Sequence, residues 1–385
     1  MKVTMKKNPL HICFFGTYDQ TYTSNMLTLS GLRANGANVT EVNAHIKVTA
    51  LNKKNEMGWI PLLKRVFKKY RIIPVIFQNW SVFPTVDVIY VGYPGHFDVF
   101  FAYVIGKIFH KKVVFNPLLI FYTGFVDEQK ILKKDDILAK LLKWGESLIY
   151  KMVDLVIADT PYQESYLVNE FGVPKERIKC VPIGADDTVY TFAPYLNTTG
   201  LALNVMYYGL YSPIHGVQYL MQAALKLKQN KNITFTMVGN GQSFQKNYDF
   251  AQKEKLTNIK FFHNTPESEH VAILQTADVF LGFLEDHPTV ERVIPNKVYQ
   301  GVALGKVVLT ADAPVIRSVF TDHENIITIK PANVDTIVLA LEELSQNPVL
   351  RTKIANAGYE LFSQKYTSKA VGKLLITYMT EIVAE

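Results

Sequence analysis

Apolar runs of strand length alternate with helical patterns along the whole chain, and this alternation constrains the fold more than any other feature. In the first half we expect strands at residues 10–16, 37–43, 87–94, 112–117, 154–159 and 178–184. Helical patterns fill the gaps, notably at Ser24–Asn35, Phe97–His110, Asp136–Met152 and Pro161–Phe171. Strands that alternate with helices are typical of parallel β-α-β units. The pattern therefore predicts an α/β fold with parallel sheets.

A second series of the same kind begins after residue 200, with strands expected at residues 203–209, 233–241, 258–263, 277–283, 306–312 and 325–330. Residues 185–200 have no periodicity and end in turn formers, so we expect a linker there. A chain of 385 residues is long enough for two domains of roughly 150–200 residues each. We therefore expect two Rossmann-like domains, at residues 1–190 and 201–365, with the linker as a hinge and a ligand cleft between them.

Composition excludes several classes of protein. Hydrophobic residues make up 48% of the chain and charged residues 19%, which is typical of a globular protein rather than a disordered one. The formal net charge is +7, and the positive excess is clustered with apolar residues, which argues against a nucleic-acid-binding protein. No uninterrupted apolar run reaches the roughly 20 residues that cross a bilayer.

The positive excess is concentrated between Lys53 and Arg71, where seven basic residues and one acid stand among apolar residues. Basic and apolar residues combined on a helix predict contact with an anionic membrane surface. The alternative is an ordinary surface helix with one face in the core.

Cysteine usage and the amino-terminal segment bear on the compartment. Cys13 and Cys180 lie in apolar, strand-like runs without metal-ligand spacing, so both are expected to be buried thiols in a reducing compartment. The basic start of the chain runs straight into a strand and lacks the long apolar stretch of an export signal. We therefore expect a cytoplasmic protein, and the missing signal argues against a periplasmic-type binding protein.

The loops that follow strands should carry the chemistry, because ligands of open parallel sheets bind beyond the carboxyl ends of the strands. In the second series, Gly209 ends the first strand, and a helix starts near Gly216 with His215 at its mouth. A helix N-terminus with a basic neighbour suits a phosphate. After the next strand, Gly239 and Gly241 allow the backbone to approach a ligand closely, although a plain turn explains them equally well.

Two further loops complete this picture. Phe262 and His263 follow the third strand and are placed to flank a planar base, although aromatic residues there are more often core. Pro295 presets the first turn of a short helix in which Asn296 and Lys297 offer donors, so a phosphate there would meet both the helix dipole and Lys297. The alternative is merely a well-started helix. Together the loops predict a site for a nucleotide diphosphate.

Several stretches resemble the retaining GT-B glycosyltransferases of family 4, which include glycogen-synthase-like and bacterial glycan-assembly enzymes. They are "YYGLYSPIHGVQYLMQAALKL", "ITFTMVGNGQ", "ADVFLGF", "IPNKVYQGVALGKVVLT" and "DLVIADTPYQESYLVNEFGVPKERIKCVPIGAD". The resemblance covers nearly the whole chain. It implies the GT-B fold, with two Rossmann-like domains facing each other across a cleft and a last helix, at about residues 366–385, that packs back on the first domain. It also implies transfer of a sugar from a nucleotide donor, with UDP favoured over GDP, to a lipid-linked or polysaccharide acceptor.

The resemblance places Gly209 and His215 beside the donor diphosphate and the two glycines of the next loop beside the base. Many relatives have Arg after the first glycine and Lys before the second, whereas this chain has Leu210 and His215. Histidine is only partly charged near neutral pH. We therefore expect Lys297 to supply the missing charge.

The family also carries two glutamates separated by seven residues. The second position is Gln300 here, which can still hydrogen-bond a ribose hydroxyl. The first falls on Arg292, so Glu291 or Glu285 is expected to contact the donor sugar.

In the first half, Gly16 and Thr17 follow the first strand and are expected to lie under the donor. His96 resembles the histidine that relatives place near the transferred sugar, and the alternative is a structural histidine.

On the acceptor side we expect Asn116, Asp127 and Glu128. The apolar stretch Leu118–Phe125 is expected to receive a lipid tail.

The catalytic set expected from these residues is His96, His215, Lys297 and Glu291. No metal or other cofactor is expected, because no D-x-D motif stands at a strand end and Asp186–Asp187 lies in the expected linker. Three readings stay open: a glycosyltransferase, a GT-B enzyme of another activity such as an epimerase or phosphorylase, and an inactive nucleotide-sugar-binding module.

Overall fold

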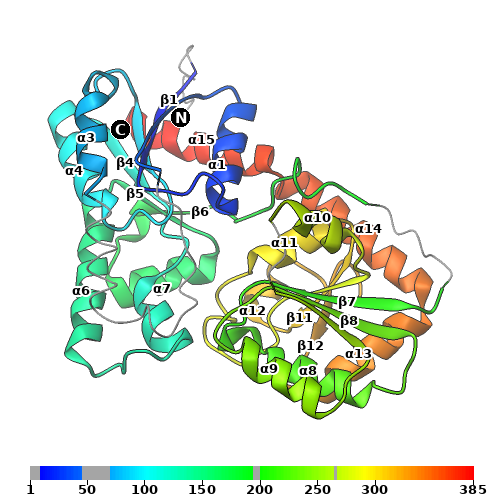
Figure 1. Ribbon diagram of the computed structural model, residues 1–385. Coiled ribbons are helices and arrows are strands. Elements are labelled where there is room, and N and C mark those ends of the chain that lie inside the picture. The colour runs from blue at the N-terminus through cyan, green and yellow to red at the C-terminus, as the bar shows by residue number, and fades with distance from the viewer. Residues whose placement is uncertain (1–8, 46–69, 194–199, 264–266) are drawn as a thin grey trace. The chain divides into compact units, whose positions relative to one another are not determined.

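A computed structural model describes residues 9–45, 70–193, 200–263 and 267–385 (Figure 1). The chain divides into two compact units. The first is built mainly from residues before 184 together with residues 368–385, and the second from residues 184–367. The sequence stretch Lys53–Arg71 lies outside the described residues except for its last two positions.

The first unit holds a six-stranded parallel sheet in the order β2-β1-β3-β4-β5-β6. Its strands are β1 (His11–Gly16), β2 (Asn38–Asn43), β3 (Val88–Val91), β4 (Lys112–Phe115), β5 (Leu155–Ala158) and β6 (Ile178–Cys180). The main helices are α1 (Thr23–Ala34), α3 (Ile72–Gln78), α4 (Asp98–Phe109), α6 (Ile137–Met152), α7 (Pro161–Phe171) and α15 (Ser368–Ala384). The short elements are η2 (Trp80–Val82), α5 (Phe121–Thr123), η3 (Gly124–Glu128) and η4 (Lys175–Arg177).

Helices cover both faces of this sheet. One core layer contains the inward residues of α3, α4, α6 and α7, and the layer on the opposite face contains those of α1 and α15. In Figure 1, α15, in red, lies beside the blue α1 although the two are far apart in sequence. A Cβ atom at Gly372 would lie 2.2 Å from the Gly31 backbone, so both glycines are needed for this close helix packing.

The second unit holds another six-stranded parallel sheet, in the order β12-β11-β10-β7-β8-β9. Its strands are β7 (Leu203–Tyr208), β8 (Ile233–Val238), β9 (Ile259–Phe262), β10 (Val279–Leu281), β11 (Val307–Ala311) and β12 (Ile327–Ile329). Its helices are η5 (Pro213–His215), α8 (Val217–Lys226), α9 (Phe244–Lys253), α10 (Glu267–Gln275), α11 (Asn296–Ala303), α12 (Pro314–Arg317), α13 (Val334–Gln346) and α14 (Pro348–Lys365). This strand order is that of a dinucleotide-binding Rossmann fold.

The prediction of an α/β fold with two parallel sheets is confirmed, and each of the twelve expected strands overlaps an observed one. Buried parallel strands read as nearly continuous apolar runs, which makes them easy to locate. The carboxy-terminal segment is helical, as expected, with α13, α14 and α15. No helix in the described residues combines the length and apolar character that crossing a membrane requires.

The expected linker differs from the structure in its first half. Tyr190 is buried and accepts a hydrogen bond from the Gln300 amide, 2.9 Å away, and the Phe192 ring packs on Tyr359 at 4.1 Å between centroids. The backbone of Ala185 is also bridged to Thr367. Residues 184–193 are therefore an integral part of the second unit, and residues 194–199 lie outside the described residues.

The two cysteines differ from each other. Cys13 is fully buried, as expected, and burial raises the pKa of its thiol to about 12. Cys180 is only partly buried, and its thiol donates a hydrogen bond to Glu164 at 3.0 Å. Burial and this carboxylate raise the pKa of the Cys180 thiol further, so neither thiol is reactive near neutral pH.

Candidate functional site

The second sheet reverses its strand order between β7 and β10, because the chain builds β8 and β9 on one side of β7 and later adds β10 on the other side. Open α/β sheets bind ligands at such a switch point, outside the carboxyl ends of the strands. The loop after β7 contains Gly209 and His215, and the loop after β10 leads through Glu285 to Lys297. The residues predicted for the diphosphate therefore meet at the expected edge of the sheet.

Lys297 is the most unusual residue at this edge. Its side chain is only 5% exposed, and its ammonium lies over the Tyr207 ring, 4.5 Å from the centroid, and 5.7 Å from the centroid of Phe283. Its Nζ atom also lies 3.4 Å from Nδ1 of His215. Burial lowers the pKa of Lys297 to about 7. These contacts include no carboxylate. A bound anion could therefore supply the negative charge that the buried ammonium needs.

His215 does not act as the partial cation that the sequence suggested. The Tyr207 hydroxyl donates to the Leu210 carbonyl at 2.5 Å and lies 2.7 Å from Nδ1 of His215. The Tyr207 hydroxyl thus bridges the Leu210 carbonyl and the His215 ring. Burial and the neighbouring Lys297 hold the pKa of His215 well below its ordinary value. His215 is therefore neutral and fastens its loop to β7.

Two helices begin at this site, and neither start is capped by a side chain. Gly216 precedes α8 in the left-handed conformation, with φ of 68°, and Pro295 precedes α11 in an extended conformation. Pro295 is thus the residue before the helix rather than its first residue. Because Lys297 reaches the His215 ring, the two starts lie close together. Uncapped helix starts leave backbone N–H groups for an anion.

The glycines of the β7 and β8 loops are explained by contact between the loops. A Cβ atom at Gly239 would lie 2.1 Å from the Gly209 carbonyl oxygen, and one at Gly241 would lie 2.6 Å from the Tyr211 nitrogen. Gly209, Gly239 and Gly241 all have positive φ, at 133°, 124° and 150°. The glycines therefore permit backbone-to-backbone packing, which fixes the floor of the site.

The two glutamates of the β10 loop, Glu285 and Glu291, differ in their surroundings. Glu285 accepts hydrogen bonds from Gln218 at 2.6 Å and Tyr219 at 3.0 Å, both in the first turn of α8. This bonding ties the β10 loop to α8. Glu291 is exposed, and Arg292 is partly buried. Glu285 is therefore fixed to the start of α8 at the switch point, whereas Glu291 is exposed on the same loop.

Gln300 is 3% exposed, and its amide donates to the Tyr190 hydroxyl. The amide that was expected to meet a ribose is thus used to hold residues 184–193 on α11. Asn296 is partly buried at the start of this helix. At the β9 end, Phe262 is 37% exposed and His263 is exposed beside Phe244, so both remain accessible to a base.

Leu210, in the position where relatives have Arg, is 48% exposed at the rim of the site.

In the first unit, Gly16 ends β1, and Thr17, the next residue, is hydrogen-bonded to a carboxylate that the sequence analysis missed. Asp98 is fully buried and accepts from the Thr17 nitrogen at 2.9 Å and from the Thr17 hydroxyl at 2.9 Å. A Cβ atom at Gly16 would lie 2.9 Å from the same carboxylate. Asp98 therefore shapes the β1 loop, which lies at the switch point between β1 and β3 of this sheet.

His96 lies inside the first unit. It is 2% exposed, stacks on Phe121 at 3.9 Å between centroids, and its Nε2 lies 3.3 Å from the Glu146 carboxylate. Glu146 also accepts from the backbone nitrogens of Phe121 and Tyr122, at 2.7 and 2.8 Å. These contacts are those of a structural histidine, the alternative considered from the sequence.

The residues expected on the acceptor side are also partly structural. Ile120 and Tyr122 are buried in the core, so the stretch Leu118–Phe125 is not a free apolar surface. Asp127 and Glu128 are partly buried in η3.

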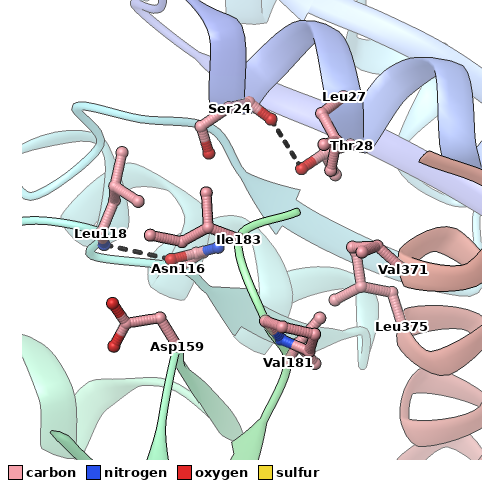
Figure 2. Close-up of a pocket in the computed structure, with 11 residues that line it drawn as sticks. Ser24, Leu27, Thr28, Asn116, Leu118, Asp159, Val181, Ile183, Val371 and Leu375 are labelled. Atoms are coloured by element: carbon pink, nitrogen blue, oxygen red, sulfur yellow. Dashed lines mark hydrogen bonds between the residues drawn. The ribbon is translucent and has the colours of Figure 1, made fainter. Parts of the chain in front are cut away.

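Asn116 lines a small cavity at the carboxyl edge of the first sheet, where Figure 2 shows its amide between Ser24 and Asp159. The remaining lining comes from α1, from Leu118 after β4, from residues 181–183 after β6, and from α15. The cavity has room for about one water molecule, too little for a sugar.

Tyr207, Asp98 and Glu146 are the structural participants that sequence reasoning missed. Tyr207 occupies an inward position of β7, and the run "VMYYG" offered its aromatic character as the only signal. Among the described residues, no cluster of three or more His, Cys, Asp or Glu side chains is arranged to hold a metal ion.

Comparison with known proteins agrees with this geometry. Residues 203–361, which include every residue discussed at the second switch point except Tyr190, match the family model of Glycosyl transferases group 1. A search of curated proteins found no match.

Solved structures similar to the chain include Anabaena Alr3699/HepE in complex with UDP and glucose, at 12% identity and a TM-score of 0.69, covering 97% of this chain and 100% of that one. Sucrose-phosphate synthase from Thermosynechococcus elongatus is similar at 14% identity and a TM-score of 0.71, covering 98% and 100%. A glycosyltransferase from Rickettsia africae is similar at 13% identity and a TM-score of 0.64, covering 98% and 99%. Residues 203–361 therefore carry a glycosyl transferases group 1 domain, in a chain whose fold is that of GT-B glycosyltransferases.

Proposed function

We propose that the protein is a glycosyltransferase that moves a sugar from a UDP-sugar to an acceptor, with retention of anomeric configuration and without a metal. The observation that carries this proposal is Lys297, a buried ammonium beside two uncapped helix starts at the switch point of the second sheet. The group 1 domain supports a sugar donor. The complexes of HepE with UDP, glucose and UDP-glucose support uridine as the base.

In this proposal Lys297 and the starts of α8 and α11 hold the donor diphosphate. Breaking the bond between the anomeric carbon and the diphosphate leaves an oxocarbenium-like sugar and a departing anion, so donors aimed at the phosphates lower the barrier. The departing phosphate oxygen accepts the proton of the acceptor hydroxyl on the same face of the sugar, so no separate base is required. His215 serves as a positioning residue, because it holds the loop that leads into α8.

Glu285 is proposed to lie beside the donor sugar, since it is anchored to the first turn of α8. Phe262 and His263 are proposed to flank the base, and Asn296 to donate to a phosphate. The acceptor is proposed to be a lipid-linked or polysaccharide glycan, as the family resemblance implies, and the location is proposed to be cytoplasmic.

Donor turnover tests the proposal. The protein should hydrolyse UDP-hexoses or transfer their sugar, and mass spectrometry over a panel of donors and acceptors would detect the products. In isothermal titration calorimetry, UDP should bind with a lower dissociation constant than GDP. Lys297→Met should abolish UDP binding, because the methionine side chain has a similar length and no charge. Turnover by Lys297→Met at the wild-type rate would overturn the phosphate-site assignment.

The second candidate is a nucleotide-sugar-binding protein without transferase activity. It is favoured by Leu210 in place of the arginine of relatives and by the Gln300 amide, which is bound to Tyr190. Tight UDP binding without turnover of any donor, with acceptors present, would support this candidate. An isomerised donor formed without an acceptor would indicate an epimerase instead.

A further inference from the structure

Exposed apolar side chains are concentrated on one part of the first unit. Thirteen of the twenty large hydrophobic side chains that are exposed in the described residues belong to residues 70–80, 97–108 and 137–148. These stretches contain α3 with η2, α4 and α6. A soluble protein rarely exposes apolar residues in such a concentrated group without a partner.

The three helices cover the same face of the first sheet, so their outer sides belong to one layer. The inward residues of all three join a single core layer. The Trp80 ring lies 5.1 Å from that of Phe109, which joins η2 to α4. Helix α4 in turn contacts α6. Figure 1 shows α3, α4 and α6 along the same side of this unit. We call their outer sides the α3–α4–α6 face.

Helix α6 shows most clearly that this face is apolar. Ile137, Leu141, Trp144 and Leu148 recur at helical spacing, and Trp144 is 64% exposed. The residues that α6 buries, including Tyr150, lie on the opposite side of the helix. A helix that packs against a sheet ordinarily turns polar residues outward. α6 is therefore apolar on the side where a globular protein would be polar.

Helix α4 repeats the pattern. Phe100, Val104 and Ile108 are exposed, while Val99 and Ile105 are buried against the sheet. At 12 residues this helix is about 18 Å long, shorter than the roughly 30 Å of a hydrocarbon core. It can lie in the surface of a bilayer but cannot cross one.

The charges of these helices identify the partner. Within α3, α4 and α6 every exposed charged side chain is a lysine: Lys107, Lys140 and Lys151. Lys143 is partly exposed and paired with Glu170. The two carboxylates of these helices, Asp98 and Glu146, are buried and accept backbone hydrogen bonds. Exposed carboxylates lie beside these helices, at Asp136 before α6 and at Glu170, which pairs with Lys143, but the helices themselves expose only cations. An apolar surface whose helices expose only cations fits an anionic lipid surface.

We propose that the α3–α4–α6 face docks the first unit on the surface of an anionic lipid bilayer, with Trp144 and Leu141 inserted among the lipids. Two copies that met through this face would bring lysines of like charge together, which disfavours a dimer. The proposal rests on the side chains of α3, α4 and α6 rather than on the stretch Lys53–Arg71 considered from the sequence, and it does not depend on the proposed transferase activity.

Vesicle flotation with the full-length protein tests the proposal. The wild type should float with vesicles of phosphatidylcholine and phosphatidylglycerol, and less with phosphatidylcholine alone. Leu141→Ser and Trp144→Ser should each weaken binding about tenfold, and Lys140→Gln and Lys151→Gln about fivefold each at low salt. Leu339→Ser, which removes a 65% exposed apolar side chain of the second unit, should leave binding unchanged.

A depth measurement gives a second readout. The chain has three tryptophans, Trp59, Trp80 and Trp144. With the first two replaced by phenylalanine, brominated lipids should quench the Trp144 fluorescence when anionic vesicles are present.

Three outcomes would overturn the proposal. The first is absence of flotation by the wild type. The second is flotation that Leu141→Ser and Trp144→Ser leave intact but that neutralising Lys64, Arg65, Lys68 and Lys69 abolishes. The third is a dimer in sedimentation that the two serine variants convert to a monomer, without any binding to vesicles. Hydrogen exchange of peptides from the core strands of each variant checks that both units are folded, so the flotation result can be interpreted whether or not the protein binds UDP.

Discussion

Replacing Lys297 by methionine is expected to stabilise the second unit and to change how its stability depends on pH. The pKa of Lys297 falls from 10.5 to about 7 on folding, because the ammonium is buried. Between pH 7 and 10.5 the unfolded chain holds this proton and the folded chain does not. Stability therefore rises with pH through this window.

The magnitude follows from the two pKa values. Relative to the neutral side chain at high pH, the lysine disfavours the folded state by about 4 kcal/mol at pH 7 and by about 2 kcal/mol at pH 9. The wild type should thus gain about 2 kcal/mol of unfolding free energy between pH 7 and 9 from this residue, and Lys297→Met should lack that gain. The methionine variant should be the more stable protein, most clearly at pH 7.

Urea unfolding at constant ionic strength measures this difference. No tryptophan lies between residues 184 and 367, so fluorescence cannot follow the second unit. Hydrogen exchange of peptides from β7 and β11 should be used instead, with fluorescence as the control for the first unit. Lys253→Met, at an exposed lysine of α9, is the matched control and should show no pH-dependent difference from the wild type.

A stability difference between Lys297→Met and the wild type that stays constant from pH 7 to 9 would refute the reasoning. It would mean that the buried ammonium keeps its proton in the folded protein.

Three other predictions follow from described contacts. The affinity for UDP should fall as pH rises above about 7, up to tenfold per pH unit, because Lys297 loses its proton; calorimetry at pH 6.5, 7.5 and 8.5 would show it, and a constant affinity would contradict it. Gly239→Ala should lower the free energy of unfolding by about 3 kcal/mol, because the new Cβ would overlap the neighbouring loop. Gly145→Ala has open space around it and should stabilise α6 by up to about 1 kcal/mol. Equal urea midpoints for the two variants would exclude this explanation. Asp98→Ala should lower the free energy of unfolding by about 3 kcal/mol, because the buried Thr17 nitrogen loses its acceptor. In the same urea unfolding measurement, Asp98→Asn should recover part of this loss.

The sequence was sufficient to predict the strands and the positions of the switch-point loops of the second sheet. Buried parallel strands such as β7 and β11 are nearly all apolar, and a turn after each one marks its carboxyl end. The start of α11 was also foreseen, because proline and the small residues after Lys297 mark a helix N-terminus. These signals are local, so a single sequence contains them.

The unforeseen contacts join residues that are far apart in the chain. Gln300 meets Tyr190 across 110 positions, and Glu285 meets Gln218 across 67. Local periodicity carries no information about such pairs. The charge state of His215 could not be predicted from the sequence either, because it depends on how deeply the ring is buried and on its distance from Lys297.

The helix at Asp98–Phe109 was predicted, but its exposed apolar side was not. Its apolar residues occur on all sides, a pattern typical of a fully buried helix. Only the folded arrangement shows that one side is exposed.

The chain leaves the first unit at Ile183 and re-enters it at Ser368, and the two crossings lie next to each other where Ala185 is bridged to Thr367. During synthesis, residues 184–367 are therefore complete while one layer of the first unit still lacks Val371, Leu375 and Met379. The later half can mature on the ribosome as an uninterrupted piece, whereas the earlier half must wait with an open apolar flank until α15 emerges. A stop codon near residue 367 should thus yield a sound second half attached to an aggregation-prone first half.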